Sequence, residues 1–170
     1  MDAHEGVNDN AAVTRNRQNN DTQHWIIERV VFKAQTLQGT YTIQQKSNGR
    51  YMDAHEGSHD NAVVTRNKQN NDTQRWVLTS VGNNIYTIQQ KSNGRYMDAH
   101  EGSHDNAVVT RNKQNNNSQR WIVTPLGNNT FAVQQKSNGR YMDAHEGSLD
   151  NAVVTRDKQN NNTQRWIFKR

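Results

Sequence analysis

Hydrophobic and polar residues alternate in short stretches that recur along the chain. In the segment YTIQQ, Tyr41, Ile43 and Gln45 fall on one face of a two-residue period, which indicates a β-strand. Four such strands, separated by polar loops, are predicted in the first complete unit, at residues 41–45, 50–54, 62–66 and 74–78. The first turn contains Gly49, which can adopt a positive φ angle. No segment has a 3.6-residue apolar period, so the chain is predicted to be all-β.

The four-strand pattern is repeated. The Asp of the motif MDAHEG falls at Asp2, Asp53, Asp98 and Asp143. The Trp that closes each unit falls at Trp25, Trp76, Trp121 and Trp166. The spacings of 51, 45 and 45 residues predict a supersecondary unit that buries its apolar face against copies of itself. Twelve strands are expected from the three complete units, at residues 41–85, 86–130 and 131–170. Around a pseudo-threefold axis these strands would bury the Trp side chains in one core.

Residues 1–40 hold a partial extra repeat and a connector. Met1 aligns with Met52, so the first copy lacks its first strand and turn. The connector carries a dense set of apolar residues, Ile26, Ile27, Val30, Val31 and Phe32. Three complete units already close the fold. We therefore expect residues 1–40 to cover the side of the domain or to join chains into a homo-oligomer, by docking or by strand exchange.

Composition narrows the range of functions. Leu, Ile, Val and Phe total 28 of 170 residues, below the roughly 20% at which disorder is the usual expectation. The net charge is only +5 and the apolar residues keep a fixed register, so we predict a small ordered core. Without cysteine, the chain has no disulfide and no thiolate metal or redox site. No apolar run approaches the ~20 residues of a transmembrane helix, and the polar start MDAHEGVNDN does not look like a signal peptide. We expect a soluble chain that does not insert into a membrane, either cytoplasmic or released from the cell.

The repeated motifs resemble those of a known family. Each unit closes with Gln-x-Trp, and each complete unit carries Gly-Arg-Tyr-Met-Asp before its polar loop. In this combination the chain resembles the ricin B-chain type (R-type) β-trefoil lectins over residues 41–170, and in part over residues 1–25. The resemblance implies a β-trefoil of three four-stranded units with pseudo-threefold symmetry. It also implies a multivalent, non-catalytic lectin or hemagglutinin, with galactose or N-acetylgalactosamine as the default sugar.

The resemblance further implies one shallow sugar site in each unit. The Asp that accepts hydrogen bonds from vicinal sugar hydroxyls corresponds to Asp53, Asp98 and Asp143. A carboxylate makes directional, charge-assisted bonds of this kind. The alternative is an Asp that caps local backbone N–H groups. Two family features are missing: the third strand reads VVTR, without an aromatic ring, and the Asn before Gln-x-Trp is Thr or Ser here.

We therefore assign the missing roles to other polar residues of each unit. A neutral imidazole could stack and donate at His55, His100 and His145, two residues after each Asp. A flat guanidinium is available at Arg66, Arg111 and Arg156. The amide could come from Asn71, Asn116 and Asn161. For each of these nine residues the alternative is a solvated polar loop. The Gln of Gln-x-Trp and the Trp itself are predicted to be structural.

Metal binding and catalysis are disfavoured by the repeats. The segment DAHEGSHD contains metal-ligand residue types, but its second His, His59, is replaced by Leu149 and Asn8 in other copies. Hydrolysis needs two differentiated carboxylates or an activated nucleophile, and near-identical units do not provide that asymmetry. We therefore predict no metal, no cofactor and no enzymatic activity.

Nucleic-acid binding is also disfavoured. The basic residues are interspersed with acidic ones, and strand alternation predicts that Tyr51, Tyr96 and Tyr141 are buried, so no aromatic face is expected beside the cations. Two alternatives to sugar binding stay open. One is an interaction or assembly module, such as a component of a toxin or surface complex, whose sugar sites have changed. The other is a binder of anionic polymers that uses the repeated Arg and Lys.

Overall fold

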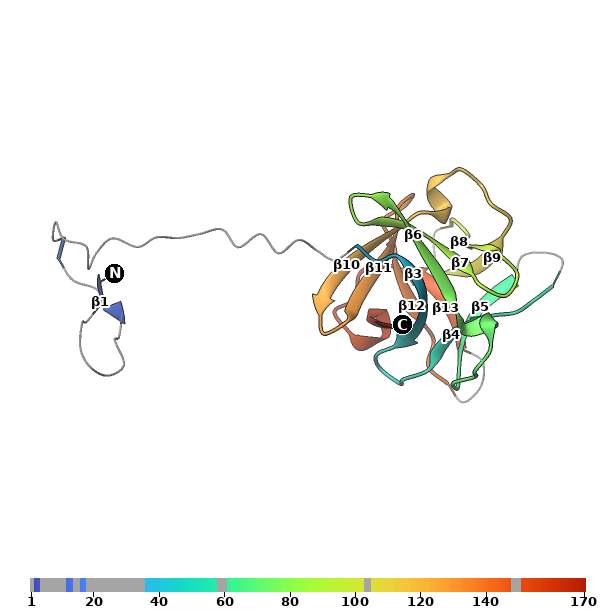
Figure 1. Cartoon of the computed structure of the whole chain (residues 1–170), viewed down its shortest axis with the longest axis horizontal. Helices are drawn as coiled ribbons and strands as arrows, with labels where there is room; N and C mark the ends of the chain where they lie inside the picture. The colour runs from blue at the N-terminus through green and yellow to red at the C-terminus, as the bar shows by residue number, and fades with distance from the viewer. Residues whose placement is uncertain are drawn as a thin grey trace. The chain divides into compact units, whose positions relative to one another are not determined.

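The computed structural model describes residues 2–3, 12–13, 16–17, 36–57, 61–102, 105–147 and 151–170. The chain divides into two compact units, Met1–Lys33 and Ala34–Arg170, and each is considered by itself (Figure 1). The apolar residues between Ile26 and Phe32 lie outside the described residues, and the packing or self-association that was predicted from them stays a prediction.

The larger unit is an all-β domain of twelve strands within its described residues, as the repeats predict. Its strands are β3 (Gly39–Gln45), β4 (Tyr51–Ala54), β5 (Asn61–Arg66), β6 (Trp76–Gly82), β7 (Ile85–Gln90), β8 (Tyr96–Ala99), β9 (Asn106–Arg111), β10 (Trp121–Gly127), β11 (Thr130–Gln135), β12 (Tyr141–Ala144), β13 (Asn151–Arg156) and β14 (Trp166–Lys169). A one-turn 3₁₀ helix precedes the last strand of each unit: η2 (Asp72–Gln74), η3 (Asn117–Gln119) and η4 (Asn162–Gln164).

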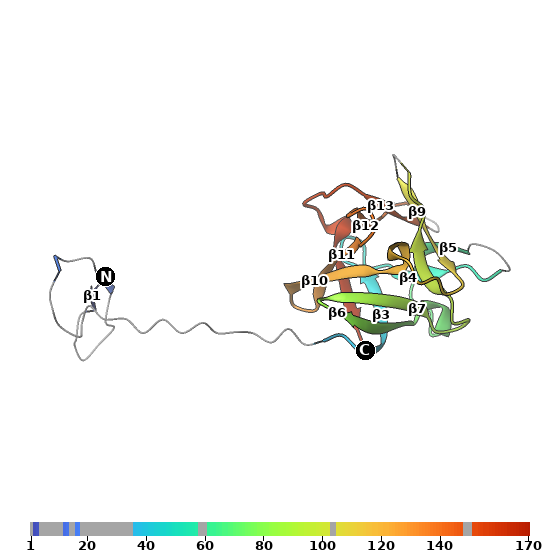
Figure 2. The same cartoon turned by 90° about the horizontal axis from the view of Figure 1, so that it is seen from above.

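The first and last strands of the three units form a closed barrel. Antiparallel pairing runs from β3 to β6, β7, β10, β11 and β14, and β14 returns to β3. Figures 1 and 2 both place the C-terminus beside β3, where this ring closes. The second and third strands form three hairpins, β4–β5, β8–β9 and β12–β13, whose third strands also pair with one another. This is the pseudo-threefold β-trefoil that the family resemblance implies.

The core consists of the residues that recur in register. Trp76, Trp121 and Trp166 have no exposed surface. The indole Nε1 of Trp76 donates to the carbonyl oxygen of Met52 at 3.1 Å, and the other two units repeat this bond at the same distance. Each ring is therefore fixed by packing and by one buried hydrogen bond, which a buried indole N–H requires. The prediction that these Trp residues are structural is confirmed.

Buried glutamines join one unit to the next. Gln45, Gln90 and Gln135 end the first strand of each unit and have no exposed surface. The Nε2 of Gln90 donates to the carbonyl oxygens of Ala54 and Thr73 in the preceding unit, at 3.3 and 3.4 Å. Gln45 and Gln135 make the equivalent bonds. A buried amide N–H group stabilises only when it is bonded, so the Nε2 bonds of the repeated Gln favour assembly of neighbouring units in one register.

The Gln of Gln-x-Trp corrects the predicted start of the fourth strand. Gln74 was expected within that strand, but it lies in η2 and the strand begins at Trp76. Its buried side chain accepts from the backbone N of Gln69 at 2.7 Å and donates to the carbonyl oxygen of Asn67 at 2.9 Å. These two bonds fold the polar loop into a turn, which strand periodicity alone does not reveal.

The smaller unit retains part of the repeat. Its strands β1 (Asp2–Ala3) and β2 (Ala12–Val13) pair antiparallel, with Asp2 opposite Val13. In the first complete unit Asp53 lies opposite Val64. The incomplete first copy therefore pairs in the register that the complete units use.

Two hairpin turns hold asparagine in the left-handed region. Asn83 and Asn84 connect β6 to β7 with φ angles of 51° and 58°. Both residues of a type I′ turn require positive φ, and asparagine tolerates this better than most residues with a side chain. Asn128 and Asn129 repeat the turn between β10 and β11.

Replacing Asn84 with alanine is expected to lower the free energy of unfolding by about 1 kcal/mol, because alanine meets the steric cost of positive φ without local hydrogen bonding. Urea unfolding measures this change. The Asn84→Gly variant is the control. Its free energy of unfolding should exceed that of Asn84→Ala by about 1 kcal/mol, because glycine adopts positive φ without the steric cost. An equal loss in both variants would show that the asparagine side chain, and not the φ angle, determines the stability of the turn.

Candidate functional site

The Asp of each complete unit lies inside the hairpin formed by its second and third strands. Asp53 in β4 is opposite Val64 in β5, and its side chain has no exposed surface. Its Oδ2 accepts a hydrogen bond from the Nε2 of Gln74 at 3.2 Å. Asp98 is held in the same way by Gln119, also at 3.2 Å. Asp143 is equally buried.

The Arg that ends the third strand covers this carboxylate. The Nη1 of Arg66 lies 3.6 Å from the Oδ2 of Asp53, and the corresponding distances are 3.7 Å in the other two units. About a quarter of each Arg side chain is exposed, whereas the Asp side chains are not. A buried carboxylate needs such a partner, because an unpaired charge at this depth is strongly unfavourable.

The His of each unit completes the cluster. His55 follows the last residue of β4, so the strand does not continue to it, and its side chain is exposed. The Nε2 of His55 lies 2.7 Å from the Nη2 of Arg66, and the corresponding distances in the second and third units are 3.0 and 2.7 Å. The structure thus brings together the predicted Asp, Arg and His of each unit. We call each set the Asp–Arg–His cluster.

The exposed face of the cluster differs from the sequence-based expectation. The Asp was expected to face an open polar loop, but it lies beneath the guanidinium. The capping alternative describes one unit, where Asp98 Oδ1 accepts from the backbone N of Ala99 at 2.8 Å. Neither Asp53 Oδ1 nor either oxygen of Asp143 has a hydrogen-bond partner among the described residues. The surface is therefore a guanidinium and an imidazole held above a partly bonded carboxylate.

A second carboxylate joins the third cluster from the preceding unit. The Nη2 of Arg156 donates to Asp105 Oδ2 at 2.6 Å, and the Nε2 of His145 lies 3.7 Å from the same oxygen. Asp105 is about half exposed. The hydrogen bond from Arg156 lowers the pKa of Asp105, and Asp105 in turn raises the pKa of Arg156. Both groups therefore keep their charges in mildly acidic solution.

Periodicity within one unit did not identify Asp105 as part of this site. The contact depends on pairing between units: Asn106 at the start of β9 lies opposite Thr155 near the end of β13, which brings Asp105 beside Arg156. The sequence contained a signal, because an Asp precedes the third strand of every complete unit, at Asp60, Asp105 and Asp150. Asp60 and Asp150 lie outside the described residues.

The predicted Asn residues serve the polar loop. Asn71, Asn116 and Asn161 each precede a 3₁₀ turn. The Nδ2 of Asn71 donates to Gln69 Oε1 at 3.0 Å, and its Oδ1 accepts from Thr73 Oγ1 at 2.9 Å. Asn116 and Asn161 make the equivalent bonds. Among the hydrogen bonds of the described residues, none joins these amides to the Asp–Arg–His clusters.

The tyrosines before each Asp require a correction. Strand alternation predicted that Tyr51, Tyr96 and Tyr141 are buried, but all three are only partly buried. Lys113 Nζ lies 5.9 Å from the ring centroid of Tyr96, and Lys158 Nζ lies at the same distance from Tyr141. Alternation assigns a side chain to one face of a strand but does not show whether that face is covered.

In the described part of the chain, no group of three or more His, Asp or Glu side chains is placed to hold a metal ion. Over the same residues, no helix is long and apolar enough to span a membrane.

Comparison with known proteins agrees with this architecture. The family model described as ricin-type beta-trefoil lectin domain-like matches residues 21–111 and again 72–155. A sequence comparison with curated proteins finds no match. The designed threefold-symmetric protein ThreeFoil is 19% identical, with a TM-score of 0.74 over 78% of this chain and 99% of its own.

Two natural proteins are similar over part of their length. The Polyporus squamosus lectin is 21% identical, with a TM-score of 0.69 over 78% of this chain and 49% of its own. The exo-beta-1,3-galactanase 1,3Gal43A from Clostridium thermocellum is 19% identical, with a TM-score of 0.70 over 76% of this chain and 30% of its own. This chain thus spans less than half the length of either protein. Because one match of the family model covers more than half of the chain, and its strands have the trefoil order, the chain belongs to the ricin-type β-trefoil lectin domain-like family.

Proposed function

We propose that this protein is a non-catalytic, multivalent lectin that binds glycans at its three Asp–Arg–His clusters. The observation that carries the proposal is their recurrence: the same three side chains meet with nearly the same distances in each complete unit. Three equivalent weak sites on one rigid domain suit a surface that displays many copies of one sugar.

The cluster provides the groups that a sugar ring needs. The guanidinium presents several N–H donors in one plane to vicinal hydroxyls, and its flat face can pack on the apolar face of the ring. The imidazole adds a donor or acceptor beside it. In the third cluster Asp105 adds an exposed carboxylate that accepts from a hydroxyl. The buried Asp holds the Arg in place.

Galactose and N-acetylgalactosamine are the sugars we propose. Their support is the family resemblance together with two similar proteins: the galactanase acts on a beta-1,3-galactan, and the Polyporus squamosus lectin was solved with Neu5Aca2-6Galb1-4GlcNAc. The absence of catalysis is proposed because, among the described residues, the first two clusters contain one carboxylate each, and in the third cluster the hydrogen bond from Arg156 lowers the pKa of the second carboxylate, Asp105, so that it does not serve as a general acid. Hydrolysis of a glycosidic bond uses two carboxyl groups with different roles.

The Arg156→Ala variant is expected to lose one of three galactose sites and to leave the affinity of the other two unchanged, because each cluster lies in its own hairpin. Calorimetric titration with galactose, or chemical-shift titration, measures the number of sites. Removing Arg156 also leaves the buried Asp143 carboxylate without its charged partner, which lowers the stability of the fold. His145→Ala is therefore the second variant: it keeps the Arg–Asp pair and should weaken the third site about tenfold.

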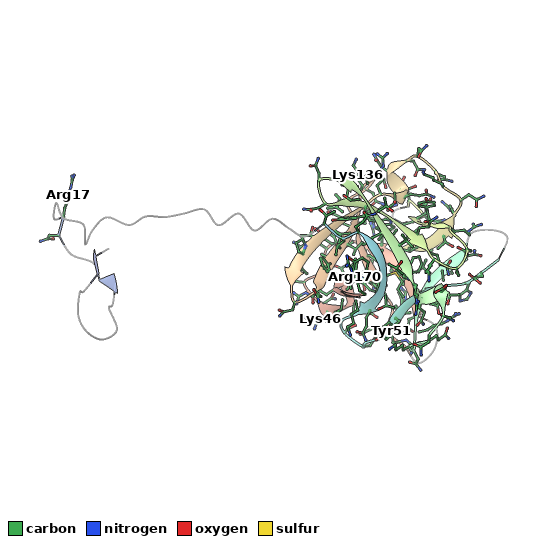
Figure 3. The ribbon with its side chains drawn as sticks, in the orientation of Figure 1. Arg17, Lys46, Tyr51, Lys136 and Arg170 are labelled. Atoms are coloured by element: carbon green, nitrogen blue, oxygen red, sulfur yellow. The ribbon has the colours of Figure 1, made fainter. Side chains whose placement is uncertain are left out.

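Lys136→Ala is the matched control, since it removes a cation of the same unit outside the cluster. Figure 3 shows Lys136 at the surface of the domain. Binding and stoichiometry should equal those of the natural chain. If three sites of unchanged affinity persist in both cluster variants, or if the lysine control weakens binding as much as they do, the clusters are not the glycan sites.

A second candidate function is an interaction or assembly module with altered sugar sites. The observation that favours it is the Arg at the third-strand position, which covers the Asp and replaces an aromatic ring. Similar trefoils also occur in a mosquitocidal holotoxin and in Cry35Ab1. Passage over a galactose-coupled matrix distinguishes the two: retention that free galactose reverses supports the lectin, and complete flow-through supports the interaction module.

A further inference from the structure

Clefts open beside the second strands of the first and third units. One cleft of about 400 Å³ lies between the first unit and the last strand of the third, and is lined by Thr40, Tyr41, Thr42, Tyr51, Lys68, Gln69, Asn70, Arg75, Lys169 and Arg170. We call it the cationic cleft. A second cleft of about 190 Å³ occupies the equivalent place beside Tyr141, with Lys158, Gln159, Asn160 and Arg165 in its wall. One wall of both clefts is thus built from the same residue types.

The opposite wall differs between the two clefts. Lys169 and Arg170 line the cationic cleft. The corresponding repeat positions are Thr124 and Pro125, of which Thr124 lines the second cleft. The loop residues between the second and fourth strands are nearly identical in all three units. The sequence has therefore diverged on the strand that faces the cleft while the shared wall has not changed.

The additional cations are exposed and held in position. Arg170 Nε donates to the hydroxyl of Tyr41 at 3.2 Å, its Nη2 donates to the carbonyl oxygen of Gln38 at 3.1 Å, and its guanidinium lies 5.5 Å from the Tyr41 ring centroid. Figure 3 shows Arg170 and Tyr51 on the same side of the domain. Four cations line the cleft, and none of the lining residues is acidic.

The loop that follows β5 carries one carboxylate, Asp72, and it is already paired with two cations. The Oδ1 of Asp72 lies 3.7 Å from the Nε of Arg75 and 3.1 Å from the Nζ of Lys91. Lys68, Lys169 and Arg170 keep the cleft positive after this pairing. Positive charge in a concave surface attracts anions more strongly than the same charge on a flat face.

We propose that the cationic cleft is a subsite for an acidic saccharide, one whose ring carries a carboxylate or a sulfate. Lys169 and Arg170 make charge-assisted bonds to the anion, the partly buried Tyr51 ring packs on the sugar face, and the amides of Gln69 and Asn70 bond to hydroxyls. Tyr51 lies opposite Arg66 in the strand register, and Lys68 follows Arg66 by two residues. The cleft and the first cluster can therefore hold neighbouring residues of one oligosaccharide. This inference rests on the proposed lectin function.

The test compares galactose, galacturonic acid and galactose 6-sulfate by calorimetric titration at about 50 mM and about 300 mM NaCl. The natural chain should bind one molecule of each acidic sugar about tenfold more tightly than galactose at low salt, and the preference should shrink at high salt. The Lys169→Thr/Arg170→Ala double variant should lose this preference and keep its affinity for galactose. Both residues are exposed, so the fold should persist.

Two matched variants sharpen the result. Lys158→Ala removes a cation from the second cleft and should not change the preference for the acidic sugars. Thr124→Lys copies Lys169 into the second cleft and should create a second acidic-sugar site.

Several results overturn the proposal. They are equal affinity for acidic and neutral sugars in the natural chain, an equal loss of preference in Lys158→Ala, inorganic sulfate as tight as galactose 6-sulfate, or a short single-stranded DNA bound more tightly than either acidic sugar. If galactose binding persists while the acidic preference is absent, this inference fails alone. If no sugar binds at all, the proposed lectin function fails with it.

Discussion

Replacing Trp76, Trp121 or Trp166 with alanine is expected to lower the free energy of unfolding by about 3–5 kcal/mol. Each ring is fully buried and shares one core, so truncation leaves a cavity that the closed barrel cannot easily fill. The substitution also leaves a buried methionine carbonyl without its indole donor. A loss of this size approaches the total stability of many small domains. Urea unfolding followed by far-ultraviolet circular dichroism measures the change.

The three Trp positions should respond alike, because they occupy equivalent places in the core. Val81→Ala is the control: this side chain is 53% exposed, so its truncation should change stability by less than about 0.5 kcal/mol. A cost below about 1 kcal/mol for Trp76→Ala would contradict the shared core.

A surface coated with galactose is expected to bind this protein at least ~10²-fold more tightly than free galactose does. A single shallow site should have a dissociation constant of roughly 0.1–1 mM, or about −4 to −5.5 kcal/mol. Once one cluster is occupied, the rigid domain holds the other two close to neighbouring sugars, so later contacts are effectively intramolecular. Calorimetry with free galactose and biosensor measurements on a galactose-coated surface supply the two affinities.

The gain should depend on how many clusters remain. A chain that carries His→Ala changes in two of the three clusters should bind the surface with nearly its affinity for free sugar. Equal affinity for free and surface-bound galactose in the natural chain would refute multivalent binding. A titration that finds one site per chain would do the same.

The fold followed from local patterns because each strand repeats the same alternation. Tyr41, Ile43 and Gln45 are buried as the two-residue period predicted, and the Trp positions form the core. The exceptions are also local. Gln74 bonds to its own loop and forms a 3₁₀ turn where a strand was predicted. Tyr51 is only partly buried, because alternation assigns a side chain to a face without showing whether that face is covered.

The candidate site was harder to predict because it depends on contacts between units. The pattern identified Asp53, His55 and Arg66, and the structure brings them together. It did not indicate that Arg66 would cover the Asp. It also missed Asp105, which reaches Arg156 through the pairing of β9 with β13. The cationic cleft depends in the same way on β14 lying beside β3.

The closure of the barrel has a consequence for synthesis of the chain. Lys169 lies opposite Thr42, so the first strand of the barrel completes its pairing only after residues more than a hundred positions further along the chain have been synthesised. Until then its edge is exposed on the nascent chain, where such edges invite pairing with other chains. The rate of the last step of folding, and not only the stability of the finished barrel, therefore decides how much monomer is obtained.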